Sequence, residues 1–260
     1  MAWHQRIAAT AALGISLAVA PVRAQDDMAL RTAEQVGTTL YQIDRAARIA
    51  AKEGERSRVF RRDDRVQGWV AEVLPDAIRI IYVGSGNGVP VGLYRVAVDR
   101  AGKVVDGIER LDAEPLPAQL AVQHIVGGRA RGVERTICSN EVETVVLPQA
   151  EAWRAYVLPR AAFPDVYLLG GSYRLGFSGS GEGPTAVEAL ASECVIVQNR
   201  PGSGALLFAE DQALHPNELH VYINRLAGKP LYVTTTPNGR TWLIQDGRIH
   251  SVEAVPAGAG

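Results

Sequence analysis

The pattern of apolar positions predicts one amphipathic helix followed by a long series of short strands. Between residues 26 and 54, apolar side chains recur at intervals of three and four, which is the period of a helix with one buried face. Gly37, Thr38 and Thr39 interrupt good helix formers, so the helix begins either near Asp26 or only near Thr38. The stripe consists of Val36, Leu40, Ile43, Ala47 and Ala50.

After residue 65 the pattern changes to alternation, which is typical of strands. A proline-bounded stretch at 113–127 predicts a short helix, and Asn-Gly and Asp-Gly pairs predict tight turns between strands. The carboxyl end is the clearest case, because 231–236, 241–245 and 248–253 predict a three-stranded meander. Further strands are expected at 66–74, 77–83, 89–98, 133–147, 166–169, 172–177, 187–197 and 219–224.

Two passages of the chain resemble each other. Trp69 and Trp153 both open a Trp-x-x-x-Val-Leu-Pro segment, and each segment is followed, after a loop, by Gly-x-Tyr-Arg with Tyr94 or Tyr173. The two spacings differ, since Trp69 to Tyr94 spans 25 residues and Trp153 to Tyr173 spans 20. A duplicated β unit would place the two tryptophans at equivalent core positions, whereas unrelated strands would not.

These patterns predict an α+β fold that is mainly antiparallel β, with an N-terminal helix, two possibly related β units and a C-terminal three-stranded meander. The expected divisions are a signal peptide at 1–24, the helix and a charged linker at 25–65, a first β unit with a short helix at 66–132, a second β unit with the meander at 133–255, and a disordered tail at 256–260.

The amino terminus indicates export. A short segment with Arg6 precedes an apolar run at 7–20, and Val22 and Ala24 stand at the −3 and −1 positions of a cleavage site. The run is shorter than the ~20 residues that span a bilayer, although an uncleaved anchor or a buried helix is the alternative. We therefore expect a bacterial protein that is periplasmic or secreted, with no transmembrane segment after cleavage.

Export determines how the two cysteines are interpreted. Cys138 and Cys194 both lie in the mature part, and an isolated pair in an oxidising compartment usually forms a disulfide. Two unpaired buried thiols are the alternative. Neither cysteine belongs to a CxxC pair or has a neighbouring histidine in the sequence, so neither is a candidate nucleophile.

Composition, charge and short motifs do not favour nucleic-acid binding, nucleotide binding or serine hydrolase activity. The net charge is −1, which does not favour a nucleic-acid partner, and the arginine-rich segment 55–65 is balanced by nearby acidic residues. The glycine loop at 84–88 leads into another strand, whereas a dinucleotide-binding loop must lead into a helix. No serine hydrolase signature is present, and no residue is nominated as catalytic or cofactor-binding.

One group of residues is a candidate metal site. His215, Glu218 and His220 lie close together, and in a strand Glu218 and His220 would share a face. Two imidazoles and a carboxylate can bind zinc and leave a position open for water. The alternative is a loop histidine and a strand histidine with structural roles, and no cofactor.

Three functions follow from these observations. We expect a non-enzymatic binding or accessory protein of the bacterial envelope, whose partner is another protein or a small ligand and which carries an exposed apolar patch or a concave sheet face. The first alternative is a metal-dependent hydrolase that uses His215, Glu218 and His220. The second is a disulfide-stapled structural or inhibitor-type β protein, which would bind a partner tightly and lack a small-molecule pocket.

Overall fold

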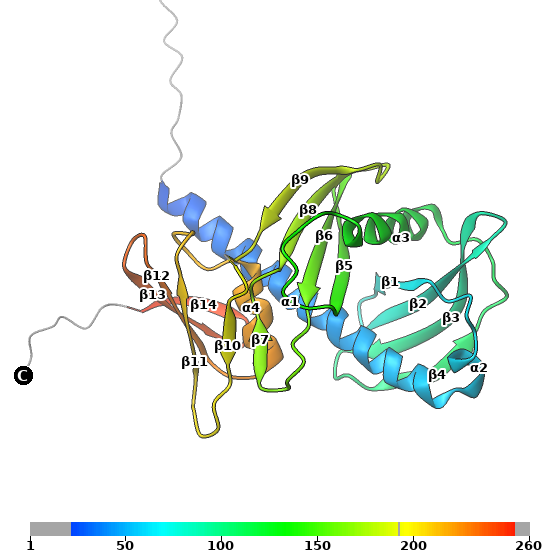
Figure 1. The fold of residues 1–260 in the computed structure, drawn as a ribbon, viewed down its shortest axis with the longest axis horizontal. Helices are drawn as coiled ribbons and strands as arrows, with labels where there is room; N and C mark the ends of the chain where they lie inside the picture. Colours follow the sequence, from blue (N-terminus) through cyan, green and yellow to red (C-terminus); the bar gives the residue numbers. More distant parts are fainter. Residues whose placement is uncertain (1–21, 192, 253–260) are drawn as a thin grey trace, which may run out of the picture.

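One long helix organises the molecule. The computed structural model describes residues 22–191 and 193–252, and α1 (Val22–Arg56) runs obliquely along three four-stranded sheets (Figure 1). At about 1.5 Å per residue, its 35 residues span roughly 50 Å. The α+β, mainly antiparallel class is confirmed. The predicted signal peptide, apart from its last three residues, and the predicted tail at 256–260 lie outside the described residues.

The helix α1 is continuous through Gly37, so the start near Thr38 is wrong. A Cβ atom on Gly37 would lie 2.4 Å from the carbonyl oxygen of Glu218 and 2.6 Å from Cβ of Val221. Glycine is therefore needed for the close approach of a second helix, and not for a break. Beyond α1, the short helix α2 (Arg58–Arg61) packs Phe60 edge-on against Tyr82, with ring centroids 4.6 Å apart.

The first sheet follows chain order as an antiparallel meander. Asn87 and Gly88 form the β2–β3 turn with positive φ, as the Asn-Gly pair predicts. The short helix predicted at 113–127 is α3 (Ala118–Arg131), which begins only after Pro117. The strands of the first sheet are β1 (Gly68–Val73), β2 (Ala77–Gly86), β3 (Val89–Asp99) and β4 (Val104–Arg110).

The second sheet is also an antiparallel meander, in the order β5, β6, β8 and β9. A separate ribbon is formed by β7 (Val166–Leu168) and β10 (Ile196–Gln198). Two strand predictions are too long, because residues 133–141 lie outside any strand and Cys194 lies in a turn before β10. The strands of the second sheet are β5 (Val142–Gln149), β6 (Ala152–Pro159), β8 (Tyr173–Ser178) and β9 (Pro184–Ala189).

The two tryptophans of the resembling passages do not occupy equivalent positions. Trp69 lies on β1, the first strand of its sheet, whereas Trp153 lies on β6, the second strand of its sheet. Tyr173 is on the strand next to Trp153, but β2 separates Tyr94 from Trp69. Both sheets are four-stranded meanders in chain order, yet the two motifs do not superpose within them.

The third sheet contains the predicted meander and one additional strand. The carboxyl-terminal strands β12 (Leu231–Thr235), β13 (Arg240–Gln245) and β14 (Arg248–Val252) are confirmed, and β11 (Leu206–Glu210) adds in parallel to β12. The strand predicted at 219–224 is wrong, because this segment belongs to the helix α4 (Glu218–Ala227), which connects β11 to β12. Leu219, Val221 and Ile223 alternate with His220 and Tyr222, and this alternation suggested a strand. The same segment also has helical spacing, at Leu219, Tyr222, Ile223 and Leu226, and the structure follows that second pattern.

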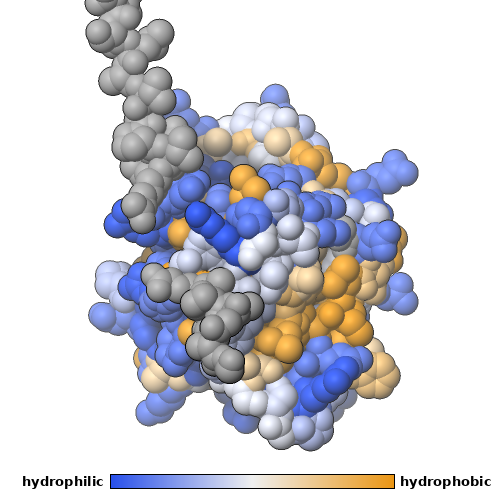
Figure 2. Space-filling view, turned by 90° about the vertical axis from the view of Figure 1, so that its left-hand side faces the viewer, coloured by the Kyte–Doolittle hydropathy of each residue, from blue (hydrophilic) through white to orange (hydrophobic). Residues whose placement is uncertain are grey.

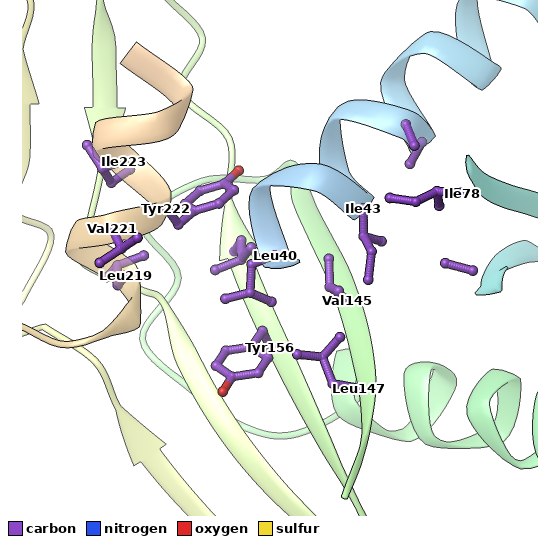
Figure 3. Close-up of a cluster of buried hydrophobic side chains, with 14 of the residues drawn as sticks. Leu40, Ile43, Ile78, Val145, Leu147, Tyr156, Leu219, Val221, Tyr222 and Ile223 are labelled. Carbon is purple, nitrogen blue, oxygen red and sulfur yellow. The ribbon is translucent and has the colours of Figure 1, made fainter. Parts of the chain in front are cut away.

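The main core lies where α1 meets α4 and the second sheet. Leu40 and Ile43 of α1 point toward Tyr156 and Val145 of the second sheet, and Tyr222 of α4 lies beside them (Figure 3). This cluster continues into the first and third sheets, so it joins all three sheets to α1. No helix in the described part of the chain is long and apolar enough to span a membrane.

Candidate functional site

The three proposed metal ligands lie at the start of α4. His215 is half-buried in the preceding loop, and Glu218 and His220 are in the first turn of the helix. On a helix, residues two apart are separated by about 200° around the axis, whereas on a strand they share a face. The argument that placed Glu218 and His220 side by side is therefore wrong.

Glu218 faces the second sheet. Its carboxylate accepts hydrogen bonds from Tyr156 Oη at 3.0 Å and from Arg174 Nη1 at 2.5 Å. Burial raises the pKa of Tyr156, and the charge of Glu218 raises it further. Arg174 also forms a bidentate pair with Glu188 at the exposed edge strand β9. Glu218 is thus occupied in tying α4 to the second sheet.

His220 faces the third sheet and is fully buried. Its Nδ1 accepts a hydrogen bond from the backbone N–H of Asn217 at 3.1 Å, which completes a capping box at the start of α4. Its Nε2 lies 3.4 Å from Oε2 of Glu210. Burial lowers the pKa of His220 to about 4, so the imidazole is neutral at neutral pH and carries its proton on Nε2.

The described residues contain no group of three or more His, Cys, Asp or Glu side chains arranged to hold a metal ion. Glu218 and His220 bind different elements on opposite sides of α4. The zinc hypothesis assumed that Glu218 and His220 share one face, and the structure does not place them so.

A different site lies at the other end of the same helix. A pocket of about 430 Å³ opens between α1, α4 and the segment that leads from β6 into β7. Ligand pockets typically occupy about 300–1,000 Å³, so this volume suits a small molecule. The lining consists of Asp44, Arg48, Glu141, Leu158, Pro159, Arg160, Ala161, Phe163, Pro164, Val166, Tyr167, Leu168, Ser172, Tyr222, Ile223 and Leu226.

One side of the pocket is formed by a buried carboxylate with three donors. Asp44 of α1 is 1% exposed. It accepts a hydrogen bond from Tyr222 Oη at 2.9 Å and forms ion pairs with Arg48 at 2.6 Å and Arg160 at 3.1 Å. Arg160 also binds Glu143.

The titration of these groups follows from their surroundings. Burial by itself would lower the pKa of Arg160, but the charges of Asp44 and Glu143 outweigh it and raise the pKa. Burial raises the pKa of Tyr222, and the charge of Asp44 adds to the effect. Arg160 therefore stays charged and the Tyr222 phenol stays neutral through the physiological pH range.

Ser172 differs from Asp44, Arg160 and Tyr222 because its side-chain hydroxyl has no hydrogen-bond partner among the described residues. Its backbone is satisfied, because its N–H donates to the carbonyl of Leu169 and its carbonyl accepts from the N–H of Leu190. Its side chain is buried, however, and Oγ has no hydrogen-bond partner among the described residues. A buried hydroxyl without a partner costs about 1–3 kcal/mol, so such groups are uncommon unless a ligand or water satisfies them.

Much of the remaining lining is apolar. Phe163 stands at the rim with 71% of its surface exposed, which is unusual for a phenylalanine. Tyr167 and Leu168 of β7 and Leu226 of α4 continue this apolar lining. The pocket is thus amphipathic, because its lining combines a hydrogen-bonded charged cluster with apolar side chains.

The disulfide anchors the β7–β10 ribbon, and β7 forms part of the pocket lining. Cys138 and Cys194 are bonded, with their Cα atoms 5.3 Å apart, which confirms the predicted pair. Cys194 is two residues before β10, and β10 is the strand that pairs with β7. The N–H groups of Leu169 and Gly170 also donate to the carbonyl of Val195, beside Cys194. The β7–β10 ribbon is therefore fixed to the segment before β5.

Sequence reasoning missed this pocket because its residues come from distant parts of the chain. Asp44 gave a usable signal, since it follows Ile43 on the apolar stripe of the first helix, where a carboxylate needs buried partners. Arg160 and Ser172 gave no such signal. Tyr222 was assigned to a strand.

In comparisons with known proteins, no protein-family model, no curated protein and no solved structure matches this chain.

Proposed function

We propose that this chain is an exported, non-enzymatic binding protein of the bacterial cell envelope, and that the pocket between α1, α4 and β7 holds a small ligand. The observation that carries the proposal is the buried hydroxyl of Ser172, which lacks a partner on the lining of a 430 Å³ pocket. The hydroxyl oxygen is shielded from solvent in this structure, so a ligand reaches it by displacing a neighbouring side chain of the lining, and the hydrogen bond it supplies removes an unfavourable feature of the unliganded protein.

The lining favours binding over catalysis. It contains no histidine, cysteine or lysine, and Ser172 has no base within hydrogen-bonding distance among the described residues. A serine nucleophile needs a neighbouring base, and acid–base catalysis needs a group that titrates near the working pH. The pocket also argues against the structural or inhibitor-type alternative, which predicts that a small-molecule pocket is missing.

Export is supported by two independent features. The disulfide between Cys138 and Cys194 is typical of an oxidising compartment, and residues 1–24 have the pattern of a cleavable signal peptide. Cleavage after Ala24 would remove no part of the described core, because the first buried side chain of α1 is that of Ala33. We expect the natural protein to begin at Gln25, which mass spectrometry of the intact protein tests directly. An intact Met1 together with two alkylatable thiols would contradict export.

Native mass spectrometry tests the binding function. Protein purified from envelope extracts is expected to carry a non-covalent small-molecule adduct that is released on denaturation. The variant Leu226→Trp, which places a larger side chain at the apolar side of the pocket, is expected to lack the adduct while keeping the circular dichroism spectrum of the parent. The proposal fails if the natural protein carries no adduct and no compound in a panel of small amphiphiles raises its melting temperature.

A protein partner is a second candidate, and a specific surface favours it. The outer face of the third sheet presents Leu207, Tyr232 and Leu243 in one row across β11, β12 and β13, and Leu207 is 75% exposed. Figure 2 shows that apolar side chains gather in a patch on this side of the molecule. Single apolar residues on a surface are ordinary, but a row across three strands indicates a contact surface. Loss of a partner on Leu207→Asp, with the pocket adduct retained, would support this function.

A further inference from the structure

We infer that the ligand of the pocket is an uncharged amphiphile: a small molecule with an apolar part that covers Phe163 and an uncharged hydrogen-bonding group that reaches Ser172. The inference rests on the proposed function, because it names the chemical class of ligand for that same pocket. It follows from the balance of charge in the lining, from the position of the unpartnered hydroxyl and from the exposed aromatic rim.

The charges of the lining are balanced before any ligand arrives. Two acidic and two basic residues line the pocket, and Asp44 is already bound by Arg48, Arg160 and Tyr222. Glu141 is exposed, so solvent screens its charge. No charged side chain of the lining is left buried and unpaired, and so neither an anion nor a cation finds a counter-charge waiting for it.

The surroundings make an anion especially unfavourable. Arg160 is shared between Asp44, which lines the pocket, and Glu143, which does not. An anionic ligand that bound Arg160 or Arg48 would approach the buried carboxylate of Asp44 and compete with it for the same donors. A cationic ligand would have to displace an arginine from Asp44. An uncharged ligand leaves the cluster as it is.

The polar requirement comes from Ser172. A hydroxyl can both donate and accept one hydrogen bond, so a hydroxyl, carbonyl, amide or amine group on the ligand satisfies it. The apolar requirement comes from the rim, where Phe163 is 71% exposed and lies near Tyr167, Leu168 and Leu226 in the lining. Covering these side chains provides the hydrophobic part of the affinity.

Two dyes that share one skeleton test the charge of the ligand. N-phenyl-1-naphthylamine is uncharged and has one amine N–H, and 8-anilino-1-naphthalenesulfonate is the same skeleton with a sulfonate. We expect fluorescence titration of the oxidised protein to show the uncharged dye binding at least about tenfold more tightly, with a Kd that changes less than about twofold between low and high salt. Tighter binding of the sulfonate would overturn the inference and leave the proposed function standing. Binding of neither dye, together with the absence of a natural adduct, would overturn the proposed function as well.

Three single substitutions locate the dye. Phe163→Ala is expected to weaken binding about tenfold, and Ser172→Ala about fivefold, because the first removes the apolar rim and the second removes the hydrogen bond. Leu207→Ala is the matched control, since Leu207 is 75% exposed and Phe163 is 71% exposed, but only Phe163 lines the pocket. It is expected to leave the Kd unchanged. Loss of binding in Leu207→Ala but not in Phe163→Ala would place the dye on the third sheet and overturn the inference.

Ser172→Ala is informative even though Ser172 is buried, because folding can be measured separately. The melting temperature of this variant is expected to be no lower than that of the parent, so weaker dye binding would not result from unfolding. An unchanged Kd in Ser172→Ala would show that the hydroxyl does not contact the ligand, and this result would overturn the polar half of the inference.

Discussion

Tyr222 of α4 donates a hydrogen bond to Asp44 of α1 at 2.9 Å, although 178 residues separate them in the sequence. This bond joins the two helices of the core at the edge of the pocket between α1, α4 and β7, and Arg48 and Arg160 complete the shell around the carboxylate. The same contact therefore serves both the stability of the fold and the shape of the pocket.

The Tyr222–Asp44 bond predicts a measurable coupling. Tyr222→Phe removes one donor to a buried carboxylate and is expected to lower the free energy of unfolding by about 1.5–3 kcal/mol. Tyr232→Phe is the control, because Tyr232 lies on the outer face of the third sheet and makes no hydrogen bond through its hydroxyl among the described residues. Denaturant unfolding of Tyr222→Phe, Asp44→Asn and the double variant is expected to give a coupling energy of about 1–2 kcal/mol. Strictly additive losses would show that the bond contributes nothing.

The contact of α1 with α4 predicts opposite effects for two glycines on helices. Gly37→Ala is expected to destabilise the protein by about 1–3 kcal/mol, because the new methyl group would lie 2.4 Å from the backbone oxygen of Glu218. Gly128→Ala on α3 meets nothing within 4 Å and is expected to stabilise by about 0.5–1 kcal/mol through helix propensity alone. Thermal melts of both variants test the comparison. A stabilising Gly37→Ala would contradict the close packing of the two helices.

The buried His220 predicts a loss of stability in acid. Its pKa is about 4 in the folded protein and near 6.5 when unfolded, so the unfolded chain takes up the proton first as the pH falls. Stability from this residue is fully present above about pH 6.5 and is lost as the pH falls toward 4, by at most about 3 kcal/mol.

His220→Gln separates this titration from the capping role. Glutamine can accept the same bond from the N–H of Asn217 but carries no charge at any pH. Unfolding experiments between pH 7 and 4.5 are expected to show a shallower decline for this variant than for the parent. Parallel pH profiles would indicate that carboxylates, and not His220, govern the acid response.

Reduction of the disulfide is expected to affect both stability and binding. Opening a loop of this length costs about 4 kcal/mol on the chain-entropy estimate, given a sequence separation of 56 residues. The uncharged dye is also expected to bind more weakly, since the β7–β10 ribbon that carries Tyr167 and Leu168 loses its anchor. Thermal melts and dye titrations with and without reductant measure the two effects. Unchanged dye affinity in reduced, folded protein would show that the pocket wall does not depend on the bridge.

The unpartnered hydroxyl of Ser172 predicts that Ser172→Ala does not destabilise the protein. Removing a buried hydroxyl that has no partner is expected to leave the free energy of unfolding unchanged or to raise it by up to about 1 kcal/mol. Most substitutions of buried residues destabilise, so this sign is distinctive. A clear loss of stability, measured by chemical denaturation, would show that the hydroxyl is bonded in solution.

Local patterns predicted those features that depend on neighbours in the sequence. The apolar stripe from Val36 to Ala50 is enough to specify α1. The turns of the carboxyl-terminal meander use the positive φ of Gly239 and of the pair Asp246-Gly247. The cysteine pair was predicted from the expected export of the chain and not from geometry. In each of these cases the information lies within a few residues or in the composition.

At α4 two local patterns conflict, which explains the wrong prediction there. Residues 219–224 alternate as in a strand, but the helical spacing from Leu219 to Leu226, the cap at Asn217 and the positive φ of Gly228 specify a helix. The error at α4 also produced the metal hypothesis, because Glu218 and His220 share a face only on a strand.

The sequence by itself determined the long helix, the predominance of antiparallel strands, the disulfide pair and the export pattern, because periodicity, turn chemistry and composition are local properties. Only the tertiary structure decided which polar residues work together. Asp44, Arg160, Ser172 and Tyr222 lie on four separate segments, and they line one pocket because α4 packs against α1 at Gly37 and the disulfide holds β7 in place. Contacts between distant segments depend on how buried faces fit together, and no spacing along the chain records that fit.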